Sequence, residues 1–230
     1  MPLSAPSIAL GSVLATGFDL PELTLPFGVG LLLSYLLGAV PFGFVMARVL
    51  KGVDIRTVGS GNIGATNAMR VLGRPLGIVA FLLDFGKGLV PTAMIAPQIA
   101  PESPGAAVLC GTAAVVGHVF PVYLGFKGGK AVATGIGAVA GIDWIVALSA
   151  GLTWLAVVGL FRVVSVASIA LGAALPIAAF VRAGDDRYGY ETVAACAALF
   201  LLILVRHRTN IQRLRAGTES RMGASKGAGA

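Results

Sequence analysis

The sequence predicts an all-α integral membrane protein with seven transmembrane helices, one of them short, with its N-terminus outside the cell and its C-terminus in the cytoplasm. Of its 230 residues, 57% are hydrophobic and only 12% are charged, about half the charged fraction of a soluble protein. The mean hydropathy is +0.89. A soluble domain of this size cannot bury so much apolar surface, so lipid must cover the remainder.

Seven apolar runs of helical length are separated by short polar or Gly/Pro-rich stretches. The fourth run offers only about 18 Å at 1.5 Å per residue, against a hydrocarbon core of about 30 Å. We therefore expect a partial span whose lipid gap is filled by its neighbours, and short helices of this kind often line cavities. The seven runs cover residues 25–50, 75–97, 105–124, 131–142, 144–161, 163–181 and 190–205.

The charges support an odd number of spans. With seven crossings, thirteen lysines and arginines fall on one side of the membrane and only Arg182 and Arg187 on the other. Acidic residues do the reverse, with only Asp54 and Glu219 on the basic side. By the positive-inside rule the basic side is cytoplasmic. The net charge of +7 is thus primarily topological, and we expect no nucleic-acid partner.

The ends of the chain carry no membrane signal of their own. Residues 1–24 lack the basic start of a cleaved signal peptide, so we expect an extracytoplasmic extension. Residues 25–214 form the membrane domain, and residues 215–230 are expected to be a flexible cytoplasmic tail. Cys110 and Cys196 both lie inside apolar runs and are interpreted as packing residues, not a disulfide.

The first unusual segment is the cytoplasmic stretch VGSGNIGATNAMR, residues 58–70. Its glycines allow positive φ angles, so that successive N–H groups can form an anion nest, and its polar side chains add hydrogen-bond partners. The alternative is a flexible Gly/Ser turn. No phosphate loop with a GK[ST] ending is present, so nucleotide binding is not indicated. The candidate phosphate-binding residues are Gly59, Ser60, Gly61, Asn62, Asn67 and Arg70.

Two further segments carry lysines. In FKGGK, residues 126–130, Lys127 and Lys130 flank a diglycine at the start of the short helix, where N–H groups and the helix dipole favour an anion. Plain positive-inside anchors are the alternative. In LLDFGKG, residues 82–88, Asp84 and Lys87 lie three residues apart on one helix face. That pair is either a structural scaffold or a substrate contact, because ionisable residues inside a span are costly.

The fourth segment lies where the last span leaves the membrane, at residues 206–213. At a spacing of three, His207 and Asn210 are expected to share a helix face and to bind or deprotonate a polar substrate. His118, near the end of the third span, is interpreted as a satisfied interhelical hydrogen bonder. No metal-ligand cluster and no serine hydrolase elbow is evident. All four segments face the cytoplasm and are expected to form one polyanion site.

These motifs resemble those of the bacterial acyl-phosphate-dependent glycerol-3-phosphate acyltransferases, the PlsY family. The resemblance runs from about Leu31 to Leu214. Four ordered motifs carry it. They are GSGNxGATNxxR at 59–70, LDxxKG at 83–88, GHxFPxxxGFKGGKxVAT at 117–134 and RHxxNIQRL at 206–214. Two departures are visible: Ala131 stands where the family commonly has glycine, and the N-terminal stretch is longer than usual.

The resemblance implies a bacterial inner-membrane enzyme whose active site faces the cytoplasm. It would transfer a fatty acyl group from acyl phosphate to sn-glycerol 3-phosphate, giving lysophosphatidic acid and phosphate, with no cofactor and no metal. Its partners would be both substrates, membrane lipids and, as a further candidate, the soluble enzyme that makes acyl phosphate. The alternative is an organophosphate or anion transporter, which needs access from both sides.

The family resemblance also implies roles for individual residues. Direct attack by the glycerol hydroxyl needs no acyl-enzyme, and the proton acceptor is either His207 or a substrate phosphate. Catalytic roles fall to Ser60, Lys130, His207 and Asn210. Substrate-binding roles fall to Gly59, Gly61, Asn62, Asn67, Arg70, Lys87, Lys127, Gly128 and Gly129. Structural or supporting roles fall to Asp84, His118 and Ser165.

Overall fold

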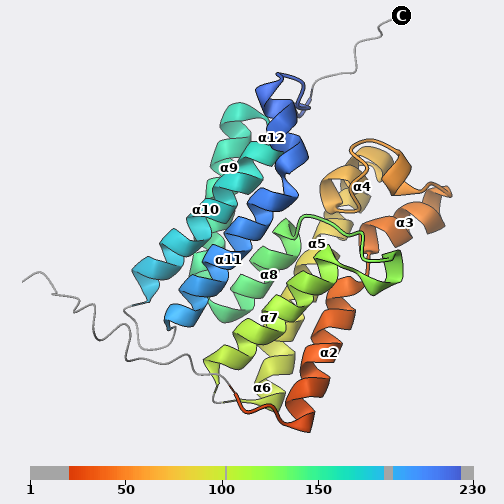
Figure 1. The fold of residues 1–230 in the computed structure, drawn as a ribbon. Coiled ribbons are helices and arrows are strands. Elements are labelled where there is room, and N and C mark those ends of the chain that lie inside the picture. Colours follow the sequence, from red (N-terminus) through yellow and green to blue (C-terminus); the bar gives the residue numbers. More distant parts are fainter. Residues whose placement is uncertain (1–20, 102, 184–188, 224–230) are drawn as a thin grey trace, which may run out of the picture.

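The computed structural model describes residues 21–101, 103–183 and 189–223, and every regular element in these ranges is helical (Figure 1). The expected N-terminal extension therefore lies mostly outside the described residues. Eleven α-helices are present in this part of the chain. They are α2 Leu25–Ala39, α3 Phe42–Lys51, α4 Ala65–Leu72, α5 Arg74–Val90, α6 Ala96–Ile99, α7 Pro104–Val119, α8 Val132–Ile142, α9 Trp144–Phe161, α10 Val164–Arg182, α11 Tyr190–Arg206 and α12 Arg208–Arg215.

Four segments of the described chain are each long and apolar enough to cross a membrane: Arg74–Ile99, Pro104–Leu124, Trp144–Phe161 and Val164–Arg182. The number rises to six if each of two bent helix pairs, α2 with α3 and α11 with α12, forms one span. The shorter apolar helix α8 is additional. The all-helical membrane architecture is thus confirmed, whereas the count of seven spans stays a prediction.

The expected first span, residues 25–50, is not one straight helix. It is divided into α2 and α3, which meet at 41°. Val40 is extended there, with φ −60° and ψ 117°, and Pro41 follows it. A proline disfavours helical geometry in the residue before it and lacks the N–H that a continuous helix needs. The break therefore turns α3 away from the bundle (Figure 1).

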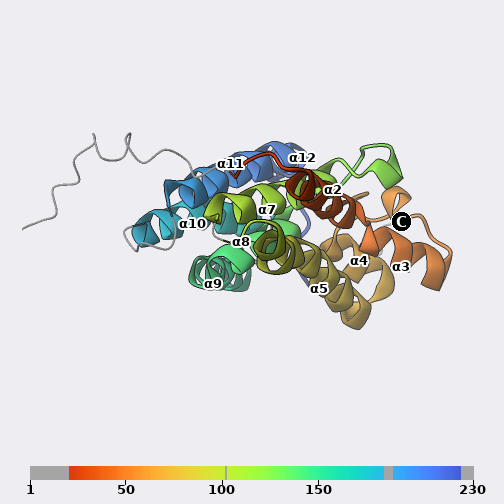
Figure 2. The same ribbon diagram turned by 90° about the horizontal axis from the view of Figure 1, so that it is seen from below.

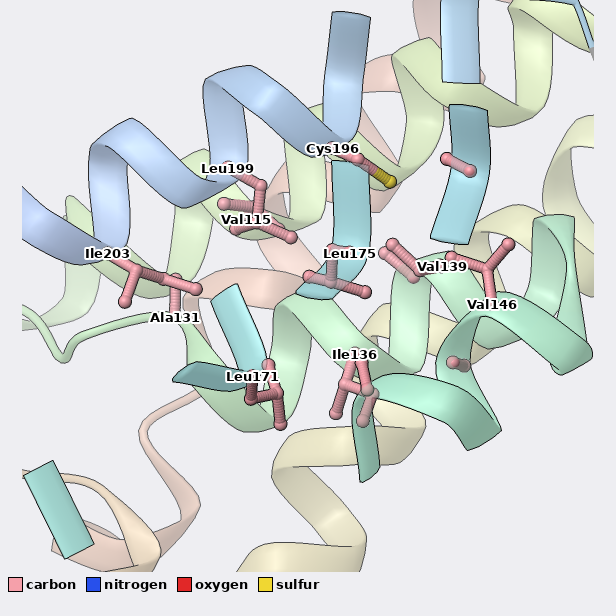
Figure 3. Close-up of a cluster of buried hydrophobic side chains, with 14 of the residues drawn as sticks. Val115, Ala131, Ile136, Val139, Val146, Leu171, Leu175, Cys196, Leu199 and Ile203 are labelled. Atoms are coloured by element: carbon pink, nitrogen blue, oxygen red, sulfur yellow. The ribbon is translucent and has the colours of Figure 1, made fainter. Parts of the chain in front are cut away.

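The short helix α8 lies between α5, α7, α9 and α11 (Figure 2). Glycines bring the backbones of α5 and α8 into contact. A Cβ on Gly88 would lie 2.0 Å from the Thr134 carbonyl oxygen, and one on Gly137 would lie 2.0 Å from that of Phe85. The other side of α8 contributes Ile136 to the main apolar core (Figure 3). Neighbouring helices thus surround α8, as expected for so short a span.

The apolar core around α8 connects it to α10 and α11. Side chains of α10 and α11, including Leu171, Leu175, Leu199 and Ile203, pack against Ile136 and its neighbours (Figure 3). Cys110 and Cys196 are buried and unpaired, as expected. This packing holds the start of α8 in a fixed place relative to the end of α11.

At the end of the bundle away from α4 and α12, a buried carboxylate joins two helices. The side chain of Asp143 caps α9 by accepting from the Ile145 N–H at 2.8 Å. It also accepts from Nε of Arg182 at the end of α10, at 2.6 Å. The cap satisfies an N–H group that the first turn of a helix leaves without a partner.

Candidate functional site

A cavity of about 200 Å³ opens between the glycine loop before α4, the loop before α8 and the corner between α11 and α12. Three segments that lie far apart in the sequence meet there (Figure 1). Three of its seven lining residues are cationic, and none is acidic. The seven lining residues are Ser60, Gly61, Asn62, Lys130, Arg206, Arg208 and Thr209. Such a lining favours an anionic ligand.

Asn67 shapes the glycine loop from behind. Its Oδ1 accepts the Ser60 N–H at 2.9 Å, and its Nδ2 donates to the carbonyl oxygens of Ile55 at 2.9 Å and Val58 at 3.0 Å. Gly59 has φ +63°, and a Cβ there would lie 2.2 Å from Asn67 Oδ1. The loop therefore winds around a buried amide, and glycine is required where it comes closest.

This geometry bears on two expectations for the loop. Asn67 was expected to contact substrate, but it is 1% exposed and its amide bonds three backbone groups of the loop. The expected nest of N–H groups is also incomplete, because the Ser60 N–H is taken by Asn67 and the Gly61 N–H by the Val58 carbonyl. The loop lines the cavity with Ser60, Gly61 and Asn62.

The diglycine of the second loop packs against the end of α7. The Gly128 N–H donates to the Val119 carbonyl and the Gly129 N–H to the His118 carbonyl, both at 3.1 Å. A Cβ on Gly128 would lie 2.1 Å from the His118 carbonyl oxygen, and one on Gly129 would lie 2.1 Å from His118 Nε2. These two N–H groups are thus structural, contrary to the expectation that they face an anion.

Arg206 holds the same diglycine from the other side. At the end of α11, its Nε donates to the Gly129 carbonyl at 3.0 Å and its Nη2 to the Gly128 carbonyl at 2.8 Å. This role of Arg206 was not predicted from the sequence, where it counts only as one of the cytoplasmic basic residues. Its place directly before His207 in the motif was the available signal.

Lys130 follows the diglycine and extends toward α12. Ala131, the next residue, has φ +62° and is fully buried. The left-handed backbone there turns the chain into α8 and explains why glycine suits this position. The Lys130 ammonium donates to Asn210 Oδ1. Burial lowers the pKa of Lys130 to about 8, although the charge of Glu219 opposes the shift.

Glu219 completes a polar chain that starts at Lys130. Asn210 Nδ2 donates to one oxygen of Glu219 at 2.6 Å, and Arg213 Nε donates to the other at 2.7 Å. These hydrogen bonds outweigh burial and lower the pKa of Glu219, with help from the neighbouring Ser165 hydroxyl. Glu219 lies in the segment that was expected to be a flexible tail, yet its carboxylate bonds Asn210 and Arg213 of α12. The sequence did offer one indication of this role, because Glu219 is one of only two acidic residues on the side of the membrane with most lysines and arginines.

His207 stands at a 56° bend between α11 and α12, not on one continuous helix with Asn210 as expected. Both side chains are buried. Nδ1 of His207 lies 2.8 Å from the Ile203 carbonyl oxygen, which can only accept, so Nδ1 carries the proton. Burial and the nearby Lys130 charge lower the pKa of His207 to about 4. The ring is therefore neutral near pH 7, with a lone pair on Nε2.

The remaining cationic candidates lie outside the cavity lining. Arg70 and Lys127 are exposed, although the Arg70 charge contributes to the lowered pKa of Lys130. Lys87 is only 2% exposed. Its Nζ bonds Asp84 Oδ1 at 2.9 Å and the Val40 carbonyl oxygen at 2.8 Å, where α2 ends. This arrangement favours the structural interpretation of the Asp84–Lys87 pair over a substrate contact.

His118 and Ser165 are buried behind the cavity lining. His118 was expected to be a satisfied hydrogen bonder, but its Nδ1 has no hydrogen-bond partner and lies 4.0 Å from Asp84 Oδ1. The nearer partner of the same Asp84 oxygen is Lys87, at 2.9 Å. Ser165, expected to have a supporting role, lies beside Glu219 without a hydrogen bond of normal geometry.

The fold and site together define a helical membrane protein with a cationic cavity at one end of its bundle, lined by residues from three of the four sequence motifs. A model of the glycerol-3-phosphate acyltransferase family matches residues 28–217. The chain belongs to this family.

Individual relatives agree over nearly their whole length. A glycerol-3-phosphate acyltransferase of Rhodospirillum rubrum is 45% identical over 213 residues, covering 90% of this chain and 95% of that protein. One from Synechococcus sp. strain CC9902 is 44% identical over 193 residues, covering 84% of this chain and 94% of that protein.

A solved structure has the same fold. It is the crystal structure of PlsY, an integral membrane glycerol 3-phosphate acyltransferase, in its glycerol 3-phosphate form. This chain is 41% identical to it, with a TM-score of 0.79, covering 86% of this chain and 96% of that one. A second structure of PlsY, in a lysophosphatidic acid form, matches with a TM-score of 0.77 and 40% identity.

Proposed function

We propose that this protein transfers a fatty acyl group from acyl phosphate to sn-glycerol 3-phosphate, giving lysophosphatidic acid and inorganic phosphate. The observation that carries the proposal is the cavity in which the Ser60 loop, Lys130 and the α11–α12 corner meet. Membership of the family and the glycerol 3-phosphate and lysophosphatidic acid forms of its solved relative support the acceptor and the product.

The cationic lining suits a reaction between two anions. Each substrate carries about two negative charges near neutral pH, since a phosphate monoester has a second pKa near 6. Lys130, Arg206 and Arg208 offset the repulsion when the two are brought together. Acyl phosphate is a mixed anhydride with a good leaving group, so correct positioning and charge stabilisation supply most of the rate.

The proton of the attacking hydroxyl needs an acceptor. With a pKa of about 4, His207 is a weak base, weaker than the phosphate of glycerol 3-phosphate with its second pKa near 6. The proposal therefore assigns the proton to a substrate phosphate oxygen. We assign His207 Nε2 to accept a hydrogen bond that orients the hydroxyl, and Asn210, bonded to both Lys130 and Glu219, to position the Lys130 ammonium.

The membrane arrangement forms part of the proposal. Seven spans, counting α8 and each bent helix pair, leave the N-terminus outside and the C-terminus in the cytoplasm, with the cavity on the cytoplasmic side of a bacterial inner membrane. Support comes from the lysines and arginines concentrated around α3, α4 and α12. Glycerol 3-phosphate enters from the cytosol and the acyl chain from the bilayer.

The experiment is lysophosphatidate formation by the full chain in nanodiscs, given glycerol 3-phosphate with either palmitoyl phosphate or palmitoyl-CoA. We expect product from palmitoyl phosphate only. Lys130→Ala should lose at least about 3 kcal/mol of transition-state stabilisation, the scale of a lost oxyanion donor, with Lys226→Ala as the matched control. No product from either donor in folded protein would overturn the proposal and favour the transporter, tested by vesicle uptake of labelled glycerol 3-phosphate.

A further inference from the structure

Helix α3 has two distinct faces. Gly43 and Ala47 are buried against the protein, whereas Val45, Val49 and Leu50 on the adjoining face are 43%, 74% and 55% exposed. Three large apolar side chains on one ten-residue helix thus leave about half or more of their surface uncovered by protein. They continue the apolar surface of the spans beyond the bend at Pro41, where α3 leaves the direction of α2 by 41°.

The polar side of α3 is basic. Arg48 and Lys51 lie in its last turn and are both exposed; Lys51 is on the side away from Val45 and Val49, and Arg48 lies between Lys51 and Val45. Arg56, just after the helix, is placed over the Phe44 ring at 5.0 Å. An exposed apolar face opposite a face of lysine and arginine is typical of helices that lie in the plane of a membrane–water interface and bind anionic headgroups.

The glycine loop is packed directly on α3. A Cβ on Gly43 would lie 2.3 Å from the Ile63 carbonyl oxygen and 3.5 Å from the Ala68 side chain, so the loop and α4 touch the α3 backbone. Ala47, Ile55, Ile63 and Ala68 form one buried apolar cluster. Because the glycine loop packs on α3, the depth of α3 in the bilayer also determines the depth of the loop that carries Ser60.

We propose that α3, the cytoplasmic part of the first bent span, is an interfacial anchor that leaves the bilayer obliquely, with Val45, Val49 and Leu50 among the upper acyl carbons and Arg48 and Lys51 at anionic lipid phosphates. It fixes the depth of the glycine loop at the level where a lipid-soluble donor meets a water-soluble acceptor. The anchor rests on the membrane topology and not on the reaction chemistry, so its test is independent of activity.

The test measures depth with a nitroxide label. The full chain carries one introduced cysteine, Val49→Cys, and is reconstituted in phosphatidylcholine vesicles with and without phosphatidylglycerol. Both natural cysteines are buried, and unmodified protein controls for their labelling. Leu32→Cys on the exposed middle of α2 and Gln212→Cys on exposed α12 supply deep and aqueous references. Collision rates with oxygen and a water-soluble nickel complex report the depth.

The expected depth at Val49 is about 5–10 Å below the headgroup level, between the two references. Phosphatidylglycerol should reduce nickel access there, and the double variant Arg48→Gln, Lys51→Gln should abolish that lipid dependence. Three results would overturn the proposal. They are water access equal to that at Gln212, as for a face left for a soluble partner; depth equal to that at Leu32; and low access to both reagents, as for contact with a second copy.

Discussion

Nε of Arg206 lies 3.0 Å from the carbonyl oxygen of Gly129. Because the same guanidinium also reaches the Gly128 carbonyl at 2.8 Å, the end of α11 holds the loop that presents Lys130. Loop and helix are separated by more than seventy residues in the sequence. The two hydrogen bonds from the Arg206 guanidinium join them at the edge of the cavity.

The first prediction concerns these two hydrogen bonds from Arg206. Arg206→Lys keeps the positive charge but cannot span both carbonyls. We expect kcat/KM for glycerol 3-phosphate to fall about 10- to 100-fold, the scale of one lost hydrogen bond from a charged donor at ~1.5–3 kcal/mol. Arg215→Lys, at an exposed position on α12, is the control for the same chemical change. Equal activity of the two variants would show that the two Arg206 hydrogen bonds do not contribute to activity.

The second prediction tests the centre of the glycine loop. Asn67→Asp removes the two N–H donors to Ile55 and Val58 and places a carboxylate beside their carbonyl oxygens. Leaving buried groups unsatisfied costs about 1–3 kcal/mol each, so the loop should open, with faster proteolysis at residues 58–64 and activity reduced at least about 100-fold. Gln98→Glu makes the same change at an exposed site; slow proteolysis in both variants would refute the role.

The third prediction follows from the pKa of Lys130, about 8. A lysine with a lowered pKa loses its charge as the pH rises through that value. Because kcat/KM reports the free enzyme, it should decline above about pH 8. In Lys130→Arg the guanidinium stays charged, so this alkaline decline should disappear even if the maximum is lower. An unchanged decline in that variant would assign it to another group.

A fourth prediction concerns Glu219, whose charge raises the pKa of Lys130 against the effect of burial. Glu219→Gln removes that charge, so the alkaline decline of kcat/KM should move to lower pH. Glu219→Asp keeps the charge and should move it less. A profile identical to the parent in Glu219→Gln, measured in folded protein, would mean that the two groups are not coupled.

The fifth prediction concerns the buried pair Asp84 and Lys87, 2.9 Å apart. Asp84→Leu or Lys87→Met alone leaves one uncompensated buried charge, at a cost of about 3–5 kcal/mol in the free energy of unfolding. The double variant removes both charges and should be destabilised much less than the sum of the single variants. Unfolding in detergent measures this double-mutant cycle. Additive losses would argue against a stabilising pair.

The sequence allowed much of this to be predicted, because hydropathy and charge act locally. Apolar runs and the placement of lysine and arginine predicted helices and a cationic cluster, and Lys130 and Ser60 do line one cavity. The bend at Val40 also had a local signal in Pro41, but a hydropathy window averages across it. The expected single run therefore concealed two helices with different surroundings.

Other features depend on tertiary contacts that no spacing reveals. The side-chain direction of Asn67 depends on how the glycine loop folds over it, so a polar residue inside a binding motif proved to be a structural centre. Likewise the N–H groups of Gly128 and Gly129 face α7 and not the cavity. Glu219 reaches Asn210 only because the chain turns back after α12, at Gly217 with φ +68°.

The enclosure of α8 has a consequence for how the protein is made. Its eleven residues rise only about 16 Å, roughly half the hydrocarbon thickness, so this segment alone cannot hold a stable place across a bilayer. Its glycines fit the backbone of α5, which is synthesised earlier, and its apolar side chains fit α10 and α11, which are synthesised later. We therefore expect stable insertion of α8 to be a late event in biogenesis, completed when the last helices arrive, so that assembly of the Lys130 site waits for the C-terminal end of the chain.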